Sequence, residues 1–215
     1  MSLSITDLLE QSSARHDHLC PRQVLGVRIG LAGLSALRLE APVRKDTALI
    51  IIESDGCFAD GLEVATGGTI GHRTLRVNDF GKIAGTFADV RTGRAVRISP
   101  APDVRERALS CVPDEPRRYF AQLQGYQVMP DAELLRIQEV ELHPTLMELI
   151  SHPLARVVCD YCGEEIINQR EVLVNGAALC RTCADDGYYL IKPTPVEIGK
   201  TVKHPIGQIQ GGRDE

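Results

Sequence analysis

The chain has 215 residues, of which 43% are hydrophobic and 25% are charged, and its formal net charge is −5 at pH 7. This composition is typical of a soluble globular protein, and the length suffices for one well-buried domain and a smaller second one. No apolar run approaches the length of a membrane span, roughly 18 residues, so we expect no membrane segment. The acidic balance argues against nucleic acid as a partner, because phosphate contacts need a basic surface.

The seven cysteines indicate metal binding rather than a disulfide framework. Their number is odd, and four of them form two C-x-x-C pairs. The start of the chain alternates polar and apolar residues and lacks both the basic region and the apolar core of a signal peptide. We therefore expect a cytoplasmic protein.

The densest group of potential ligands in the first part of the chain is His16, His18 and Cys20, with Asp17 between the histidines. Pro21 suits the first position of a helix, which places Cys20 at the N-cap, where the helix dipole favours a thiolate. Cys20 is therefore a candidate nucleophile or metal ligand. The alternative is that both histidines are exposed loop residues and Cys20 is a small buried hydrophobe.

Two helices are predicted around this group, over residues 5–14 and 21–39. The second is apolar on most sides, which favours burial. It carries three glycines near one face, and because glycine weakens a helix interior, we expect another backbone to approach there: Gly26, Gly30 and Gly33. Arg28 is the odd charge on this helix. It holds an anionic ligand, forms a salt bridge or lies at a solvated edge.

A second cysteine follows the next predicted element. Residues 48–53 have the pattern of a buried strand, Cys57 comes soon after it, and residues 58–65 return to helical spacing. Sites in proteins that mix helices and strands commonly form at such strand ends. Glu53 or Asp60 is placed to orient a ligand or act as a general base, or only to cap and solvate the strand end.

Beyond this point the pattern changes to short strands and interrupted helices. Residues 83–90 and 95–98 predict an antiparallel hairpin, residues 103–125 predict helix in pieces, and residues 134–142 predict another strand. Cys111 has no partner in the sequence, so we expect it in the core.

The most specific motif lies near the C-terminus. It consists of two C-x-x-C pairs separated by seventeen residues, the spacing of a four-thiolate structural zinc site: Cys159, Cys162, Cys180 and Cys183. Between the pairs, Asn175-Gly176 predicts a hairpin on a type I′ turn, and a short helix is expected after the second pair. A knuckle, a hairpin and a helix describe a treble-clef finger.

The finger is acidic. Residues 151–192 contain four basic and six acidic side chains, a local charge of −2. Such a finger is poorly suited to phosphates, so docking, dimerisation or protein contact is favoured. We therefore divide the chain into an α+β core domain with an antiparallel sheet over residues 1–150, the finger over residues 151–192 and a tail over residues 193–215.

An ordered series of residues in the core resembles the FmdE family, named for a component of formylmethanofuran dehydrogenase. The series is His16-x-His18-x-Cys20-Pro21-x4-Gly26-x-Arg28, Glu53, Cys57-x-x-Asp60, Thr66-Gly67-x-Thr69-x-Gly71 and Asp79-Phe80-Gly81-Lys82. The resemblance implies an α+β core, an accessory zinc finger and a homodimer. Many members have a cysteine where this chain has Gly68; His72 either replaces it as a ligand or is a surface histidine.

The resemblance also implies a metal or thiol site at His18, Cys20 and Cys57, with His16 close by. Two thiolates and an imidazole form a set that zinc or another transition metal accepts while leaving a position for water or substrate. The candidate catalytic residues are thus Cys20, Cys57, His18 and Asp60, and the candidate cofactor-binding residues are His16 and Arg28.

Three functions are compatible with these features. The leading one is an FmdE-like metal-binding protein, accessory to partner subunits of a molybdenum or tungsten oxidoreductase such as formylmethanofuran dehydrogenase. The second is a stand-alone zinc- or thiol-dependent enzyme that acts on a small molecule. The third is a non-catalytic interaction module that docks through the zinc finger. The reaction of a multi-component enzyme does not transfer with a resemblance to one component.

Overall fold

The computed structural model describes residues 4–16 and 18–190, which form parts of two compact units, Met1–Ser151 and His152–Glu215. Asp17 and the predicted tail, residues 193–215, lie outside the described residues. Within those described ranges, no helix has the length and apolar character needed to cross a membrane.

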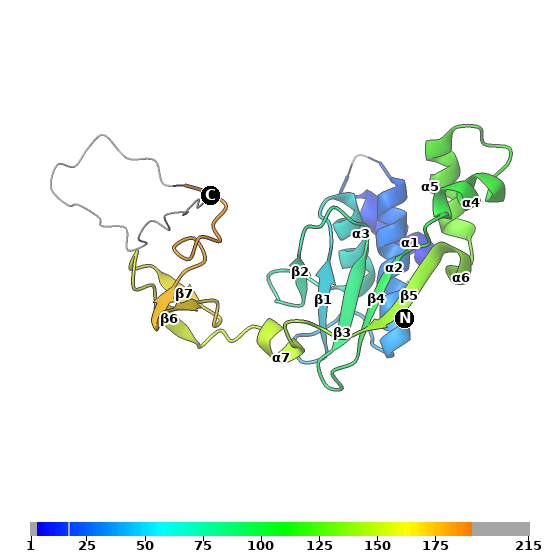
Figure 1. Ribbon diagram of the computed structural model, residues 1–215. Coiled ribbons are helices and arrows are strands. Elements are labelled where there is room, and N and C mark those ends of the chain that lie inside the picture. Colours follow the sequence, from blue (N-terminus) through cyan, green and yellow to red (C-terminus); the bar gives the residue numbers. More distant parts are fainter. Residues whose placement is uncertain (1–3, 17, 191–215) are drawn as a thin grey trace, which may run out of the picture. The chain divides into compact units, whose positions relative to one another are not determined.

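The first unit is built on a mixed five-stranded sheet with the order β2-β1-β3-β4-β5 (Figure 1). Only the β1–β2 pair is parallel, and the predicted hairpin of β3 and β4 is confirmed. The α+β expectation is therefore confirmed for this unit. The strands are β1 (Ala48–Ile52), β2 (Leu75–Val77), β3 (Gly85–Asp89), β4 (Ala95–Pro100) and β5 (Leu135–Val140).

Helices precede, interrupt and follow these strands (Figure 1). Both helices predicted before the first strand are confirmed, as is the interrupted helical stretch after β4. The strand predicted over residues 134–142 is shorter than expected, because a helical turn takes its first residue and its pairing with β4 ends at Val140. The helices are α1 (Ile5–Ser13), α2 (Pro21–Leu37), α3 (Cys57–Thr66), α4 (Val104–Cys111), α5 (Arg118–Val128), α6 (Asp131–Leu134) and α7 (Leu146–Leu149).

Helix α2 is the centre of the core, as its apolar sequence predicts. It packs against α3 and against strands β3 and β4. At Gly33, an added β-carbon would lie 2.5 Å from the ring of Phe87, which is fully buried on β3. The glycine therefore lets a large aromatic ring pack directly on the helix backbone.

The contact between α2 and α3 depends on glycines of both helices. A β-carbon added at Gly26 would lie 2.9 Å from the backbone nitrogen of Leu62 and still closer to the carbonyl oxygen of Phe58. One added at Gly61 would collide with the carbonyl of Gln23. The expected close approach of another backbone is thus confirmed, and the approaching element is α3.

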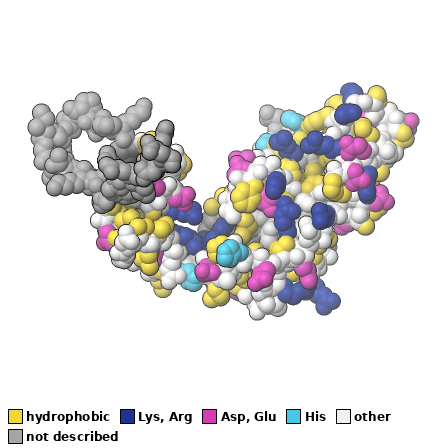
Figure 2. All heavy atoms as spheres, viewed as in Figure 1, with side chains coloured by type: hydrophobic (Ala, Val, Ile, Leu, Met, Phe, Trp, Pro, Cys, Tyr) yellow, Lys and Arg dark blue, Asp and Glu magenta, His cyan; other side chains and the backbone are white. Residues whose placement is uncertain are grey.

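The visible surface of the first unit carries both signs of charge. Figure 2 shows Lys and Arg side chains interspersed with Asp and Glu side chains over this face.

One prediction for this unit is wrong: Cys111, at the end of α4, is exposed rather than part of the core. Helix α4 buries only Val104 and Ala108, so its last residue falls on the solvent side.

The second unit consists of two short hairpins. The first joins β6 (Arg156–Val158) and β7 (Glu165–Ile167), and the second joins β8 (Val172–Val174) and β9 (Ala177–Leu179). Asn175 and Gly176 have φ values of 51° and 86°, which confirms the type I′ turn. After β9 the described residues form turns, so the predicted short helix is wrong up to residue 190, and the treble clef is represented there by knuckle and hairpin only.

The α2–α3 contact makes a stability prediction. Gly26→Ala should lower the free energy of unfolding by about 2 kcal/mol, because the new methyl group meets the backbone of α3 and the helices must separate. Urea unfolding followed by circular dichroism measures this difference. The control is Gly71→Ala, whose β-carbon meets nothing within 4 Å and should change stability by less than about 0.5 kcal/mol. Equal stability of the two variants would contradict the prediction.

Candidate functional site

Two cysteines that lie 37 positions apart in the sequence meet at the α2–α3 contact. Cys20 is the N-cap residue of α2 and Cys57 is the first residue of α3. Because the two helices cross close to their N-termini, at Gly26 and Gly61, the two thiols come close enough for Cys20 to influence the ionisation of Cys57. Cys20 is buried and Cys57 is partly exposed.

A buried amide fixes the position of Cys20. The backbone N–H of Cys20 donates to Oε1 of Gln23 at 2.8 Å, and Nε2 of Gln23 donates to the carbonyl of Ser12 at 2.8 Å. Gln23 is fully buried and so ties the end of α1 to the start of α2. Sequence reasoning missed Gln23, although Gln at the third helical position is a known capping signal.

The thiol pair disfavours the thiolate form at Cys57. Burial raises the pKa of Cys57, and the hydrogen bond and charge of Cys20 raise it further, with a smaller contribution from Asp60. Ionisation of one thiol therefore disfavours ionisation of the other unless a cation lies beside them. A soft metal ion would supply that positive charge, and cysteine thiolates are its preferred ligands.

The loop after α1 is fastened to α3 beside Cys57. Nε2 of His16 lies 2.5 Å from Oδ2 of Asp60, and the Arg15 guanidinium donates to Glu63 at 2.8 Å. Arg15 also lies 3.8 Å from Asp60. His16 and Asp60, both predicted as site residues, are therefore brought together next to the thiol pair.

His18 is placed differently from the two cysteines. It is exposed, whereas Cys20 is buried. Across residues 4–16 and 18–190, the groups of three or more potential ligands with all ligand atoms within 4.8 Å consist of the finger cysteines alone. The structure thus gathers Cys20 and Cys57, and the three-ligand set with His18 stays a prediction.

Arg28 has the structural role that the sequence left as an alternative. Its guanidinium donates to the backbone carbonyls of Tyr126 at 2.8 Å and Met129 at 2.6 Å, and to Oδ1 of Asp131 at 2.6 Å. Further bonds reach Asp131 and the carbonyl of Gln127. With its donors occupied in this way, Arg28 caps the C-terminal end of α5 and forms, with Asp131, the salt bridge that was the alternative to an anionic ligand.

Glu53 likewise has a protein partner. Its carboxylate accepts two hydrogen bonds from Arg97, at 2.6 and 2.8 Å, and both side chains are largely buried. These bonds lower the pKa of Glu53 despite the opposing effect of burial. Of the two roles proposed from the sequence, the general base is not supported by this geometry, because the carboxylate is engaged in a bidentate ion pair.

The Gly68 position is packed in the core. A β-carbon there would lie 3.2 Å from both the side chain of Ile50 and the hydroxyl of Thr66. His72 is exposed in the turn that follows. Of the two alternatives for His72, a replacement ligand or a surface histidine, its exposure therefore favours the surface histidine.

The second candidate site is the four-cysteine cluster of the finger. All four sulfur atoms lie within 4.8 Å of one another, and the sulfurs of Cys162 and Cys180 are 3.9 Å apart. Four thiolates at about 2.3 Å from a tetrahedral zinc ion lie roughly 3.8 Å from each other. The cluster therefore fits a tetrahedral metal ion, with both C-x-x-C pairs contributing as predicted.

Backbone amides prepare this cluster for a cation. Although burial opposes ionisation, hydrogen bonds from the backbone of Cys162, Cys180 and Tyr161 lower the pKa of Cys159 to about 6. Burial and the neighbouring sulfurs raise the pKa of Cys183. One thiolate is thus favoured in the free protein, and the remaining thiols ionise when a metal ion offsets their mutual repulsion.

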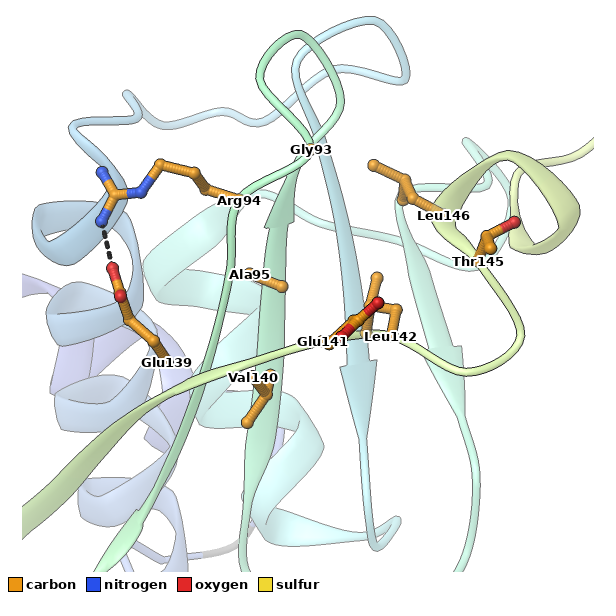
Figure 3. Close-up of a pocket in the computed structure, with 9 residues that line it drawn as sticks. All are labelled: Gly93, Arg94, Ala95, Glu139, Val140, Glu141, Leu142, Thr145 and Leu146. Carbon is orange, nitrogen blue, oxygen red and sulfur yellow. Dashed lines mark hydrogen bonds and ion pairs between the residues drawn. The ribbon is translucent and has the colours of Figure 1, made fainter.

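A surface pocket lies at the other end of the sheet. Its volume is about 350 Å³, and it is lined by the β3–β4 turn, the end of β5 and the start of α7 (Figure 3). Arg94 and Glu139 form a 2.6 Å ion pair at its rim. Through its partner on β3, Ala95 lies at the level of the first half of β1, whereas Cys57 follows the end of β1. The pocket and Cys57 therefore lie at opposite ends of the strands. None of the predicted site residues lines this pocket.

Comparison with known proteins agrees with this architecture. Residues 15–136, more than half of the chain, match the family model described as "FmdE, Molybdenum formylmethanofuran dehydrogenase operon". The crystal structure of a tungsten formylmethanofuran dehydrogenase FmdE-like protein, from Syntrophus aciditrophicus, superposes with a TM-score of 0.56. It is 23% identical, with 88% of this chain and 96% of that chain covered, and it shows similarity of fold.

A curated relative extends the comparison. A protein from Archaeoglobus fulgidus, described as a probable S-adenosyl-L-methionine-binding protein, is 37% identical over 98 residues. The match covers 44% of this chain and 26% of the relative. The chain thus corresponds to about a quarter of that protein.

The Glu53–Arg97 pair makes a pH-dependent prediction. Because the folded pKa of Glu53 lies below its unfolded value, the pair stabilises the protein above that unfolded value, and the contribution is lost as pH falls through the folded pKa. Glu53→Gln should therefore cost about 2 kcal/mol of unfolding free energy at pH 7 and progressively less below about pH 4.5. Urea unfolding of both proteins from pH 7 to pH 3.5 measures this. A cost that does not change with pH would contradict the assignment.

Proposed function

Because this chain belongs to the FmdE family, we propose that it is a metal-binding protein with two separate sites. The first is a structural zinc ion on Cys159, Cys162, Cys180 and Cys183. The second is a transition metal on the Cys20–Cys57 pair, with His18 as the additional ligand. The observation that carries the second site is the meeting of two thiols at the N-termini of α2 and α3.

The residues of the core site suit this role. Thiolate and imidazole ligands favour zinc or another borderline or soft transition metal over magnesium or calcium. Such an ion would act as a Lewis acid toward a bound ligand. Asp60 and its partner His16 lie beside Cys57 and are suited to orient a ligand or accept a proton there. This dyad favours the second candidate function, a stand-alone zinc- or thiol-dependent enzyme.

We place the protein as an accessory to partner subunits of a molybdenum or tungsten oxidoreductase. The support is the family description and the name of the structural relative from Syntrophus aciditrophicus. We expect this assembly to be cytoplasmic. The finger suits protein contact, because several apolar side chains of this unit are exposed: Leu154, Leu173, Tyr188 and Leu190. The same surface is also suited to homodimerisation or to a docking module without catalysis.

Metal analysis tests the two-site proposal. The zinc-saturated chain should hold about two metal equivalents, and Cys57→Ser should hold about one, because the finger cluster is untouched. The matched control is Cys111→Ser, which changes an exposed thiol outside both sites and should keep both equivalents. Equal stoichiometry in Cys57→Ser and the unmodified protein would eliminate the core site.

Affinity purification from the native host tests the accessory role. The tagged full-length protein should bring down subunits of a molybdenum or tungsten enzyme, identified by mass spectrometry and by metal content. A variant with the exposed finger residues changed, Leu154→Ser with Leu173→Ser, should lose this association while the finger keeps its zinc. Recovery of an unaccompanied, catalytically active protein would favour the stand-alone enzyme.

A further inference from the structure

The surface pocket beside the β3–β4 turn is separate from both cysteine sites. Its volume, about 350 Å³, lies at the lower end of the roughly 300–1,000 Å³ that small-molecule sites occupy. None of the cysteines lines it. The size therefore favours a small ligand over a nucleotide-sized cofactor, and the lining side chains determine the chemistry of that ligand.

One part of the pocket is an apolar surface. It is formed by four side chains that are buried or half-buried: Ala95, Val140, Leu142 and Leu146. They come from the start of β4, the end of β5, the segment after β5 and the first turn of α7 (Figure 3). Such a surface suits a hydrocarbon group, because removing methylene groups from water is favourable.

The positive charge of the pocket is already paired. Arg94 is the sole Lys or Arg among the lining residues, and its guanidinium donates to Oε1 of Glu139 at 2.6 Å (Figure 3). An anionic ligand would have to displace Glu139 from this ion pair. The arrangement thus disfavours an anion, because the exchange would replace one carboxylate contact by another and leave Glu139 without its partner.

Two other polar side chains present acceptor oxygens. Among the residues that the structure describes, the Glu141 carboxylate has no hydrogen bond or ion pair, and Figure 3 shows it on the side of the pocket where Thr145 and Leu146 lie. The Thr145 hydroxyl donates its proton to Oε2 of Glu148 at 2.6 Å, so toward a ligand it only accepts. An ionised carboxylate also only accepts. The ligand must therefore supply the hydrogen-bond donors.

We propose that this pocket binds a primary alkylammonium group and is a ligand site separate from both metal sites. The ammonium pairs with the Glu141 carboxylate and donates to the Thr145 hydroxyl, while the alkyl chain lies on Leu142 and Leu146. The lining residues carry two carboxylates and one guanidinium, a net charge of −1, which one ammonium group neutralises. This group occurs on free amines and on the lysine side chains of other proteins.

Binding of butylammonium to the zinc-loaded full chain tests the proposal. Titration followed by amide NMR spectra should give saturable shifts at Gly93, Glu141 and Leu146, and butyrate or butanol at the same concentrations should give none. Methylammonium should bind about tenfold more weakly, because it lacks the methylene groups that lie on the leucines. Absence of saturable shifts with butylammonium, or equal affinity for butyrate, would overturn the proposal.

Glu141→Gln tests the assigned carboxylate. Because Glu141 is exposed, the change should preserve the fold, and the loss of charge should weaken butylammonium binding about fivefold. The matched control is Glu133→Gln, which changes an exposed carboxylate that does not line the pocket and should leave the affinity unchanged. Equal affinity in Glu141→Gln and the unmodified protein would overturn the assignment.

A blocked lysine, Nα-acetyl-lysine methylamide, distinguishes the two sources of the ammonium group. It should bind more tightly than butylammonium if the pocket serves a lysine of a partner protein, because the peptide groups then add contacts. It should bind more weakly if the pocket serves a free amine. Failure of both probes to bind would overturn the alkylammonium site.

Discussion

The contact between α2 and α3 is the constraint on which the core site depends. Gly26 and Gly61 let the two helix backbones approach more closely than any side chain allows. Because this crossing lies near both N-termini, it brings Cys20 and Cys57 together. Any larger residue at either glycine would separate the helices and, with them, the two sulfur atoms.

Two charged residues on this framework act in its construction rather than in ligand binding. Arg28 closes the C-terminal end of α5, and Glu53 pairs with Arg97 across the sheet. Each is largely buried, and a buried charge requires a partner that satisfies its hydrogen-bonding groups. Because the protein itself supplies these partners, both residues are engaged in the framework, and Arg28 ties the C-terminal end of α5 to α2.

The two cysteine sites differ in how many coordination positions of a bound metal ion they leave for other ligands. In the finger, four thiols converge within 4.8 Å, which completes a tetrahedral shell and suits a structural ion. In the core, two thiols meet beside the His16–Asp60 pair, so an ion there would need further ligands. An incomplete protein shell is what a metal requires if it is to bind water, a substrate or a group from a partner protein.

The amino-acid sequence by itself determined the elements and the finger. Hydrophobic periodicity predicted α1, α2, β1 and the β3–β4 hairpin, because burial imposes that period on the chain, and the spacing of the four finger cysteines predicted their cluster, because those ligands lie on two local knuckles. Only the tertiary structure decided how distant residues meet. The pairing of Cys20 with Cys57 and the capping role of Arg28 both depend on the packing of separate helices, and periodicity within one helix carries no information about its neighbour.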